Sequence, residues 1–251
     1  SAALAVAGVS QVDSASAGFG RSELALVASN GFSGRYARST ASVAVSAIAS
    51  DGAGMEADWD YAARRRIADL PDPSEVGARA AERAVARLGP RKPPTGAFPV
   101  IFDRRAAPSL IGHLLAAANG ASVARGSSWL IGRMGDQVLP DWADLLEDPL
   151  APAGPASRPF DGEGVASRRS PIVSGGRLAR WLLDVSSSRR LGLSTTGNAR
   201  RGVSAPPSPG PTNVRLTPGQ MSRDALIAET GRGFLVTHLL GSSVNPNTGD
   251  Y

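Results

Sequence analysis

The segment from Asp72 to Ala97 constrains the fold more than any other part of the sequence. Asp72 is a candidate helix N-cap, Pro73 suits the first helical position, and Glu75 stands where a capping box needs it. An apolar stripe then recurs every fourth residue, at Val76, Ala80, Ala84 and Leu88. Gly89-Pro90 ends this helix, and the proline-rich residues 90–97 cannot continue a regular element. We therefore predict two domains, over residues 1–92 and 93–251.

A second stripe on the same helix is charged and consists of Arg79, Arg83 and Arg87. It could face a partner. Because Glu75 and Glu82 lie nearby on the helix, we interpret it instead as a solvated face with local ion pairs.

The section before the helix alternates between apolar and polar residues and is rich in small side chains. Residues 22–29, 34–40 and 42–49 read as strands, separated by the turn signals Asn30-Gly31 and Asp51-Gly52. Alternation over 42–49 is typical of a sheet with one buried face. Antiparallel strands with short turns are the simplest arrangement.

The section after the linker mixes short strands, helices and loops. We predict a strand at 98–102 and a helix at 106–119, followed by a loop-rich region. A hairpin about Gly175-Gly176 is expected within 171–185, and a surface loop at 205–211. A short helix at 222–230 then leads into a strand at 234–240.

Composition excludes several classes of protein. Hydrophobic residues make up 42% of the chain and charged residues 20%, as in soluble globular domains. The longest apolar stretches, such as residues 110–118, are too short to span a bilayer. The net charge of +5 comes almost entirely from arginines that are spread along the chain with few aromatic residues, so we expect neither a nucleic-acid nor a membrane partner. Cysteine is absent, which favours a reducing, cytoplasmic location.

Residue chemistry alone nominates no catalytic site. The sequence has no Gly-x-Ser-x-Gly elbow and no Walker A motif, and it holds only two histidines. His113 on an apolar helix and His238 within the last predicted strand are interpreted as satisfied structural residues. The acidic pair Asp161 and Glu163 is interpreted as a tight turn whose carboxylates cap backbone N–H groups.

Six short motifs nevertheless occur in a specific order from about residue 100 to the end of the chain. They cover residues 109–115, 119–120, 125–128, 160–164, 194–198 and 247–251. In this order they resemble the PmbA (TldE) branch of the TldD/PmbA family, once called modulators of DNA gyrase. The resemblance implies an α+β fold, with an N-terminal sheet-and-helix domain followed by a β-rich C-terminal domain. The chain opens at Ser1 and ends inside the last motif, so we expect both domains to be truncated.

The catalytic branch of that family carries His-Glu-x-x-x-His on a helix. Alignment on the motifs at 119–120 and 125–128 places Ile111 at the first His, Gly112 at the Glu and Ala116 at the second His. None of these side chains can bind zinc or act as a base for metal-bound water. We therefore expect no catalytic residue, metal ligand or cofactor in this chain.

Without that motif, the helix at 106–119 is free to serve as core. It is expected to bury Leu110, Leu114 and Ala118.

The resemblance implies a non-catalytic subunit of a heteromeric zinc metalloprotease that acts on unfolded or extended peptides. The zinc would belong to a TldD-like partner subunit. Residues expected to line the peptide-binding cavity or the interface are Arg125, Gly126, Asp161, Gly162, Glu163 and Asn198. For each of them, a loop turn without a ligand is an equally open interpretation.

Two alternatives remain open from the sequence. One is a stand-alone, metal-free homodimer that binds peptides. The other is a serine-type hydrolase, against which the missing Gly-x-Ser-x-Gly argues.

Overall fold

The structure is a computed structural model, and it describes residues 2–241 and 243–250. The chain divides into two compact units. Unit 1 comprises residues 1–25, 35–95 and 153–155, and unit 2 comprises residues 26–34, 96–152 and 156–251. The domain limits of 1–92 and 93–251 stay a prediction.

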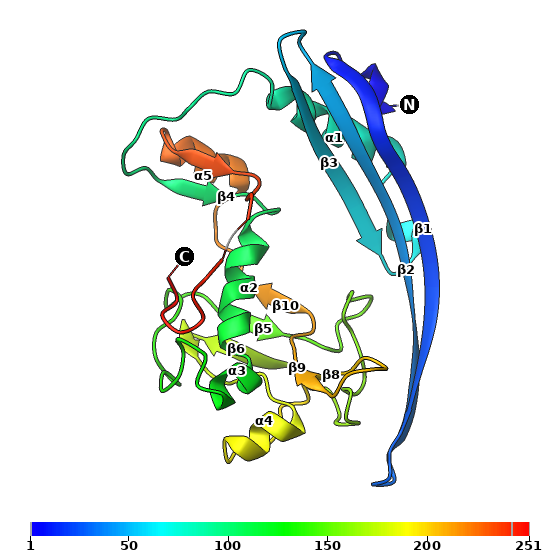
Figure 1. The fold of residues 1–251 in the computed structure, drawn as a ribbon, viewed down its shortest axis with the longest axis vertical. Coiled ribbons are helices and arrows are strands. Elements are labelled where there is room, and N and C mark those ends of the chain that lie inside the picture. The colour runs from blue at the N-terminus through cyan, green and yellow to red at the C-terminus, as the bar shows by residue number, and fades with distance from the viewer. Residues whose placement is uncertain (1, 242, 251) are drawn as a thin grey trace. The chain divides into compact units, whose positions relative to one another are not determined.

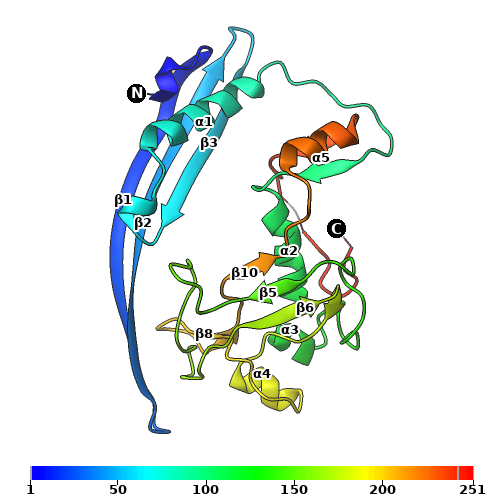
Figure 2. The same ribbon diagram turned by 180° about the vertical axis from the view of Figure 1, so that it is seen from behind.

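Unit 1 is a three-stranded sheet with one helix on it (Figures 1 and 2). Its sheet has the order β1-β2-β3, and β2 pairs antiparallel with β3 from Ala41↔Arg64 to Ser50↔Met55. Its elements are η1 (Ala2–Ala5), β1 (Val9–Val27, whose end belongs to unit 2), β2 (Ser33–Ser50, whose start belongs to unit 2), β3 (Met55–Arg64), η2 (Ile67–Asp69) and α1 (Pro73–Ala86).

The strand predictions for unit 1 are partly corrected. The predicted strands at 34–40 and 42–49 form the single strand β2, and 22–29 is the end of the longer β1. Strand β3 was not predicted, because Asp58 and Asp60 are buried in it and so invert the apolar alternation. Most residues of β1 are exposed on both faces of the strand. The sequence of its first half therefore lacks the alternation of apolar and polar residues that predicts a half-buried strand.

Helix α1 begins as predicted. Asp72 accepts a hydrogen bond from the Ser74 backbone N at 2.8 Å. Val76 and Ala80 are fully buried, and they pack in two small clusters with Val43 and Ala47 of β2. Because the packed side chains are mostly alanine and valine, helix and sheet approach closely.

The arginine stripe of α1 forms ion pairs with carboxylates of β3 and stays partly exposed. Arg79 Nε lies 2.8 Å from Asp60 Oδ2, and Arg83 NH1 lies 2.7 Å from Asp60 Oδ1. Arg87 Nε lies 3.3 Å from Glu56 Oε2. The expectation of a solvated face with local ion pairs is therefore corrected in part: the three side chains stay 33%, 26% and 42% exposed, but their main ion pairs are with carboxylates on β3. The local pair of Arg79 with Glu75 is present, at 3.4 Å.

Unit 2 contains short strands, short helices and long loops. A four-stranded sheet has the order β10-β5-β6-β7, β4 pairs in parallel with β11, and β8 pairs with β9. The strands are β4 (Val100–Phe102), β5 (Leu145–Glu147), β6 (Ser170–Ser174), β7 (Arg177–Leu178), β8 (Ala199–Arg200), β9 (Ser208–Pro209), β10 (Val214–Leu216) and β11 (Phe234–Val236). The helices are α2 (Ala107–Ala117), α3 (Gly120–Ala124), α4 (Val185–Arg190) and α5 (Arg223–Thr230).

The core of unit 2 forms between α2 and the four-stranded sheet. Leu114 and Ala118 are buried there as predicted, together with sheet residues such as Ile172. Leu110, which was also predicted to be core, is 38% exposed because it lies on the outer side of the helix.

Three boundaries in unit 2 differ from the predictions. The hairpin about Gly175-Gly176 is present, but β7 ends at Leu178, and the residues up to Leu183 run irregularly through the core. The predicted surface loop at 205–211 contains β9, in which Pro209 is buried. Strand β11 ends at Val236, so His238 lies outside it and is exposed, contrary to the structural role predicted for it.

No helix in the described part of the chain is long and apolar enough to cross a membrane.

Candidate functional site

Helix α2 carries the three positions aligned with a zinc motif. Ile111 is half-buried against the core, whereas Gly112 and Ala116 are exposed. A Cβ at Gly112 would meet no atom within 4 Å, so a larger residue would fit there. Isoleucine, glycine and alanine offer no lone pair to a metal. Residues 2–241 and 243–250 also contain no group of three or more His, Cys, Asp or Glu that could hold a metal ion.

His113 lies between these positions and is half-buried, as predicted. It is therefore flanked by side chains that cannot join it in a metal site. Since zinc sites in proteins use three or four ligands, the residues present on α2 do not fit zinc.

The turn after α3 presents the predicted residues Arg125 and Gly126 to solvent. Asn119 caps α3 by accepting a hydrogen bond from Ala121 N at 2.9 Å, and its amide donates to Pro209 O at 2.9 Å. Arg125 occupies the C-cap position of α3, and Gly126 follows with a φ of 79°. Both residues are exposed, so a partner or ligand could reach them.

Asp161 lies inside unit 2 and organises its own loop. Its Oδ1 accepts hydrogen bonds from Glu163 N and Val165 N, each at 2.9 Å, and its Oδ2 accepts from Ala199 N at 3.0 Å. Only 2% of the residue is exposed. The predicted turn with a capping carboxylate is confirmed for Asp161, and the three bonds leave its carboxylate facing backbone rather than solvent.

Glycines shape the same loop. A Cβ at Gly162 would lie 2.9 Å from Arg201 Cβ, and Gly164 has a φ of 82° with a would-be Cβ 2.7 Å from the Phe32 ring. Phe32 and Phe160, both in unit 2, pack edge to face with ring centroids 5.0 Å apart. Larger side chains at these two glycines would displace the loop.

Glu163 is the one half-buried carboxylate of this loop. Its Oε2 accepts a hydrogen bond from Val185 N, the first residue of α4, at 2.8 Å. Burial raises the pKa of Glu163 above the usual 4.5, and the nearby carboxylates of Asp161 and Asp184 add to this rise against the hydrogen bond from Val185. Glu163 is therefore the loop residue best placed to exchange a proton or to accept a cationic group.

Asn198 is buried at the centre of a polar network. Its Nδ2 donates to both carboxylate oxygens of Glu147 at 3.0 Å, and its Oδ1 accepts from Arg180 NH1 at 2.9 Å and from Thr196 Oγ1 at 2.7 Å. With 1% of the residue exposed, Asn198 supports its neighbours and does not reach solvent.

Glu147, the acidic partner of Asn198 in this network, was not predicted as a site residue from the sequence. Its Oε1 accepts hydrogen bonds from Thr212 N at 2.5 Å and from Thr212 Oγ1 at 2.8 Å, and Arg180 NH2 pairs with its Oε2. The one hint in the sequence is an acidic residue directly after the apolar pair Leu145-Leu146. A buried carboxylate with these partners ties β5 to the loops at 180 and 212.

A basic cavity of 380 Å³ adjoins this network, which contributes Arg180 and Thr196 to its lining. It is lined by Val165, Ala166, Arg168, Arg169, Ser170, Arg180, Thr195 and Thr196. None of the six predicted site residues lines this cavity. Asn198 Oδ1 nevertheless accepts hydrogen bonds from two lining residues, Arg180 and Thr196. The loop that carries Asp161 and Glu163 leads directly into it at Val165.

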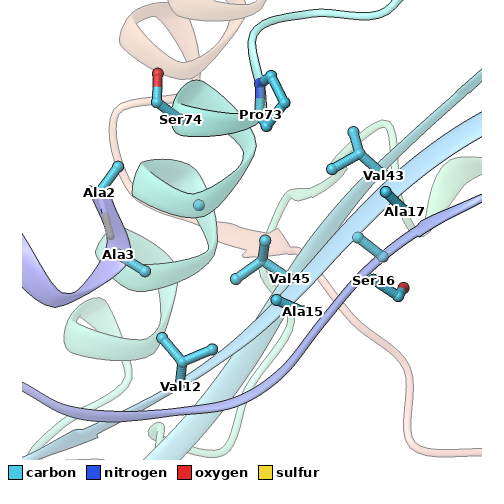
Figure 3. A pocket seen from close by; sticks show the side chains of 12 residues that line it. Ala2, Ala3, Val12, Ala15, Ser16, Ala17, Val43, Val45, Pro73 and Ser74 are labelled. Carbon is cyan, nitrogen blue, oxygen red and sulfur yellow. The ribbon is translucent and has the colours of Figure 1, made fainter.

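A second cavity, of 470 Å³, lies in unit 1 between η1, α1 and the strands β1 and β2 (Figure 3). Alanine, valine, serine, glycine and proline line it, so it offers no titratable group. The basic cavity of unit 2 is thus the better candidate for a site with chemistry.

Comparisons with known proteins agree along the chain. Residues 1–88 match the model of the PmbA/TldA metallopeptidase central domain, and residues 95–251 match that of the PmbA/TldA metallopeptidase C-terminal domain. A crystal structure from Thermotoga maritima, named for a proposed role as modulator of a DNA gyrase, superposes with a TM-score of 0.90 at 27% identity, over 99% of this chain and 57% of that one.

Two curated relatives represent the two branches. Metalloprotease PmbA of Escherichia coli O157:H7 is 40% identical over 223 residues, which are 89% of this chain and 48% of that protein. A metalloprotease TldD homolog of Haemophilus influenzae is 30% identical over 177 residues, which are 68% of this chain and 36% of that protein. The chain spans about half the length of the PmbA relative. It belongs to the TldD/PmbA metallopeptidase family, in the PmbA branch.

Proposed function

We propose that this chain is part of a non-catalytic, PmbA-like cytoplasmic subunit that forms a heteromeric zinc metalloprotease with a TldD-like partner. The observation that carries the proposal is the chemistry of α2. At the aligned positions it holds Ile111, Gly112 and Ala116, which supply neither metal ligand nor base. Since the chain belongs to a metallopeptidase family, the zinc and the base then come from the partner.

The contribution of this chain is binding rather than bond cleavage. We propose that it helps to enclose unfolded or extended peptides, and that Arg125, Gly126 and Glu163 are the predicted residues a peptide or partner reaches. All three lie at or near the surface. Gly162 gives the loop its close backbone packing, while Asp161 and Asn198 position the loops from inside.

Co-purification and peptidase assays test the proposal on the full-length protein. We expect a stoichiometric TldD-like chain to accompany it at native expression. Cleavage of an unfolded peptide should need both chains and be lost when a histidine of the partner's motif is replaced by alanine.

Metal analysis of the isolated protein can contradict the proposal that the chain lacks zinc ligands. About one equivalent of tightly held zinc per monomer of the isolated full-length protein would contradict the alignment over 111–116. Peptide binding by a homodimer that never captures a TldD-like chain would favour the stand-alone module instead.

A further inference from the structure

The basic cavity of unit 2 holds more positive charge than its internal partners neutralise. Arg180 is paired with the buried Glu147, and Arg169 Nε lies 3.8 Å from Asp148 Oδ2, with 59% and 33% of the two side chains exposed. An ion pair this long and exposed contributes little. Arg168 also lines the cavity and is exposed, and within the described residues it has no ion-pair partner.

The wall formed by Arg180 is preorganised. Its guanidinium donates to Pro171 O at 3.1 Å and to Asn198 Oδ1 at 2.9 Å, besides the pair with Glu147. Only 14% of its side chain is exposed. A guanidinium held at this many points loses little conformational entropy when a ligand arrives, which favours binding.

We propose that this cavity binds a carboxylate of an extended peptide, with Arg168 as the main contact and Arg169 beside it. The inference rests on the proposed peptide-binding function and names the group that unit 2 recognises. Planar guanidinium groups match carboxylates in bidentate pairs. Val165 and Ala166 add an apolar wall that suits the side chain next to the carboxylate.

A phosphate group fits the cavity less well. Phosphate sites commonly add the backbone N–H groups of a glycine-rich loop or of a helix N-terminus. The lining residues include neither. The lining residues therefore favour a carboxylate, which can be the peptide's C-terminus or an acidic side chain.

Fluorescence anisotropy of labelled peptides tests this inference on the full-length protein. One sequence is made with a free C-terminal carboxylate, as a C-terminal amide, and as an amide with one internal glutamine replaced by glutamate. We expect at least one carboxylate form to bind about tenfold more tightly than the plain amide. Whichever form gains identifies the source of the carboxylate.

Arginine variants test whether the preference for a carboxylate arises in this cavity. Arg168→Gln should erase the preference, so that the carboxylate forms bind no more tightly than the amide, whereas Arg168→Lys should keep part of it because the charge remains. Arg190→Gln, an exposed arginine on α4 outside the cavity, should keep all of it. Thermal melting confirms that each variant is folded.

Four results would overturn the inference. Equal binding of all three peptides would refute it while the proposed peptide-binding function stands, and absence of any peptide binding would refute both. A preference that survives in both Arg168→Gln and Arg169→Gln would place the carboxylate elsewhere. Displacement of amide and acid peptides alike by inorganic phosphate would assign the cavity to phosphate.

Discussion

Asp60 of unit 1 and Glu147 of unit 2 are both carboxylates held by arginines, but they lie in different surroundings. Asp60 binds Arg79 and Arg83, whose side chains are 33% and 26% exposed. Glu147 binds Arg180, with 14% of its side chain exposed, and adds the neutral donors of Asn198 and Thr212. The first site joins a helix to a sheet through a buried carboxylate and partly exposed arginines, and the second joins loops through groups that are all largely buried.

The difference follows from how each unit provides hydrogen-bond partners for its backbone N–H and C=O groups. The long strands of unit 1 bond to one another, so side-chain charges are needed only between layers. The strands of unit 2 have two to five residues, and many loop N–H groups need side-chain acceptors. Removing Glu147 should therefore cost unit 2 more than removing Asp60 costs unit 1, because the arginines that Asp60 leaves are more exposed to solvent than Arg180 is.

The largest expected effect is that of Glu147→Ala. Loss of the carboxylate leaves Arg180 and Asn198 without their shared partner in the interior, which should lower the free energy of unfolding of unit 2 by about 3–5 kcal/mol. Urea unfolding of the full-length protein measures it. The matched control is Glu229→Ala on the exposed face of α5, expected within about 0.5 kcal/mol of the wild type. If Glu147→Ala lost as little stability as Glu229→Ala, the buried network would not stabilise unit 2, and the contrast with Asp60 of unit 1 would not hold.

A smaller loss is expected for Asp60→Asn, about 1–3 kcal/mol near neutral pH. Burial acts to raise the pKa of Asp60, but hydrogen bonds and charge from Arg79 and Arg83 outweigh it, so the pKa lies below 3.8. A lowered folded pKa contributes stability above the unfolded pKa, which is lost as the pH falls through the folded value. The difference between wild type and variant should therefore shrink in urea titrations below about pH 4. A difference that is constant with pH would show that the ion pairs are not its source.

The smallest effect, and one of opposite sign, is expected for Glu163→Gln. Because burial raises the pKa of Glu163 above 4.5, ionisation of this residue destabilises the folded state as the pH rises through that range. Glutamine keeps an acceptor for Val185 N without the charge, so it should stabilise unit 2 by up to about 1 kcal/mol near pH 7. The gain should vanish below about pH 4, as thermal melting at the two pH values would reveal. Glu163→Ala, which removes the acceptor, should destabilise, and stabilisation by alanine would argue against the role of the hydrogen bond.

Predictions from the sequence succeeded where the information was local. The cap of α1 at Asp72, the turn at Gly175-Gly176 and the end of α5 at Gly231 all depend on residues within one turn. They failed for β3 and α4. In β3 the buried Asp58 and Asp60 break the expected alternation, and α4 is short and almost entirely polar, so neither gives a periodic apolar signal.

In the candidate site, too, features set by neighbouring residues could be predicted, whereas features that depend on distant segments could not. That Asp161 caps its own turn could be read from two glycines and an acidic pair within four residues. The burial of Asn198 could not, because its partner Glu147 lies 51 residues away along the chain. The arginines of the cavity likewise gather from 168–169 and from 180 only when the loops fold.

The sequence by itself determined the family, the ends of its best helix and the lack of ligand-type side chains at Ile111, Gly112 and Ala116. Only the tertiary structure decided which carboxylates meet the arginines of α1, and which polar residues become internal. Capping and turn chemistry act between neighbours in the chain, whereas burial and ion pairing depend on which distant segments pack together.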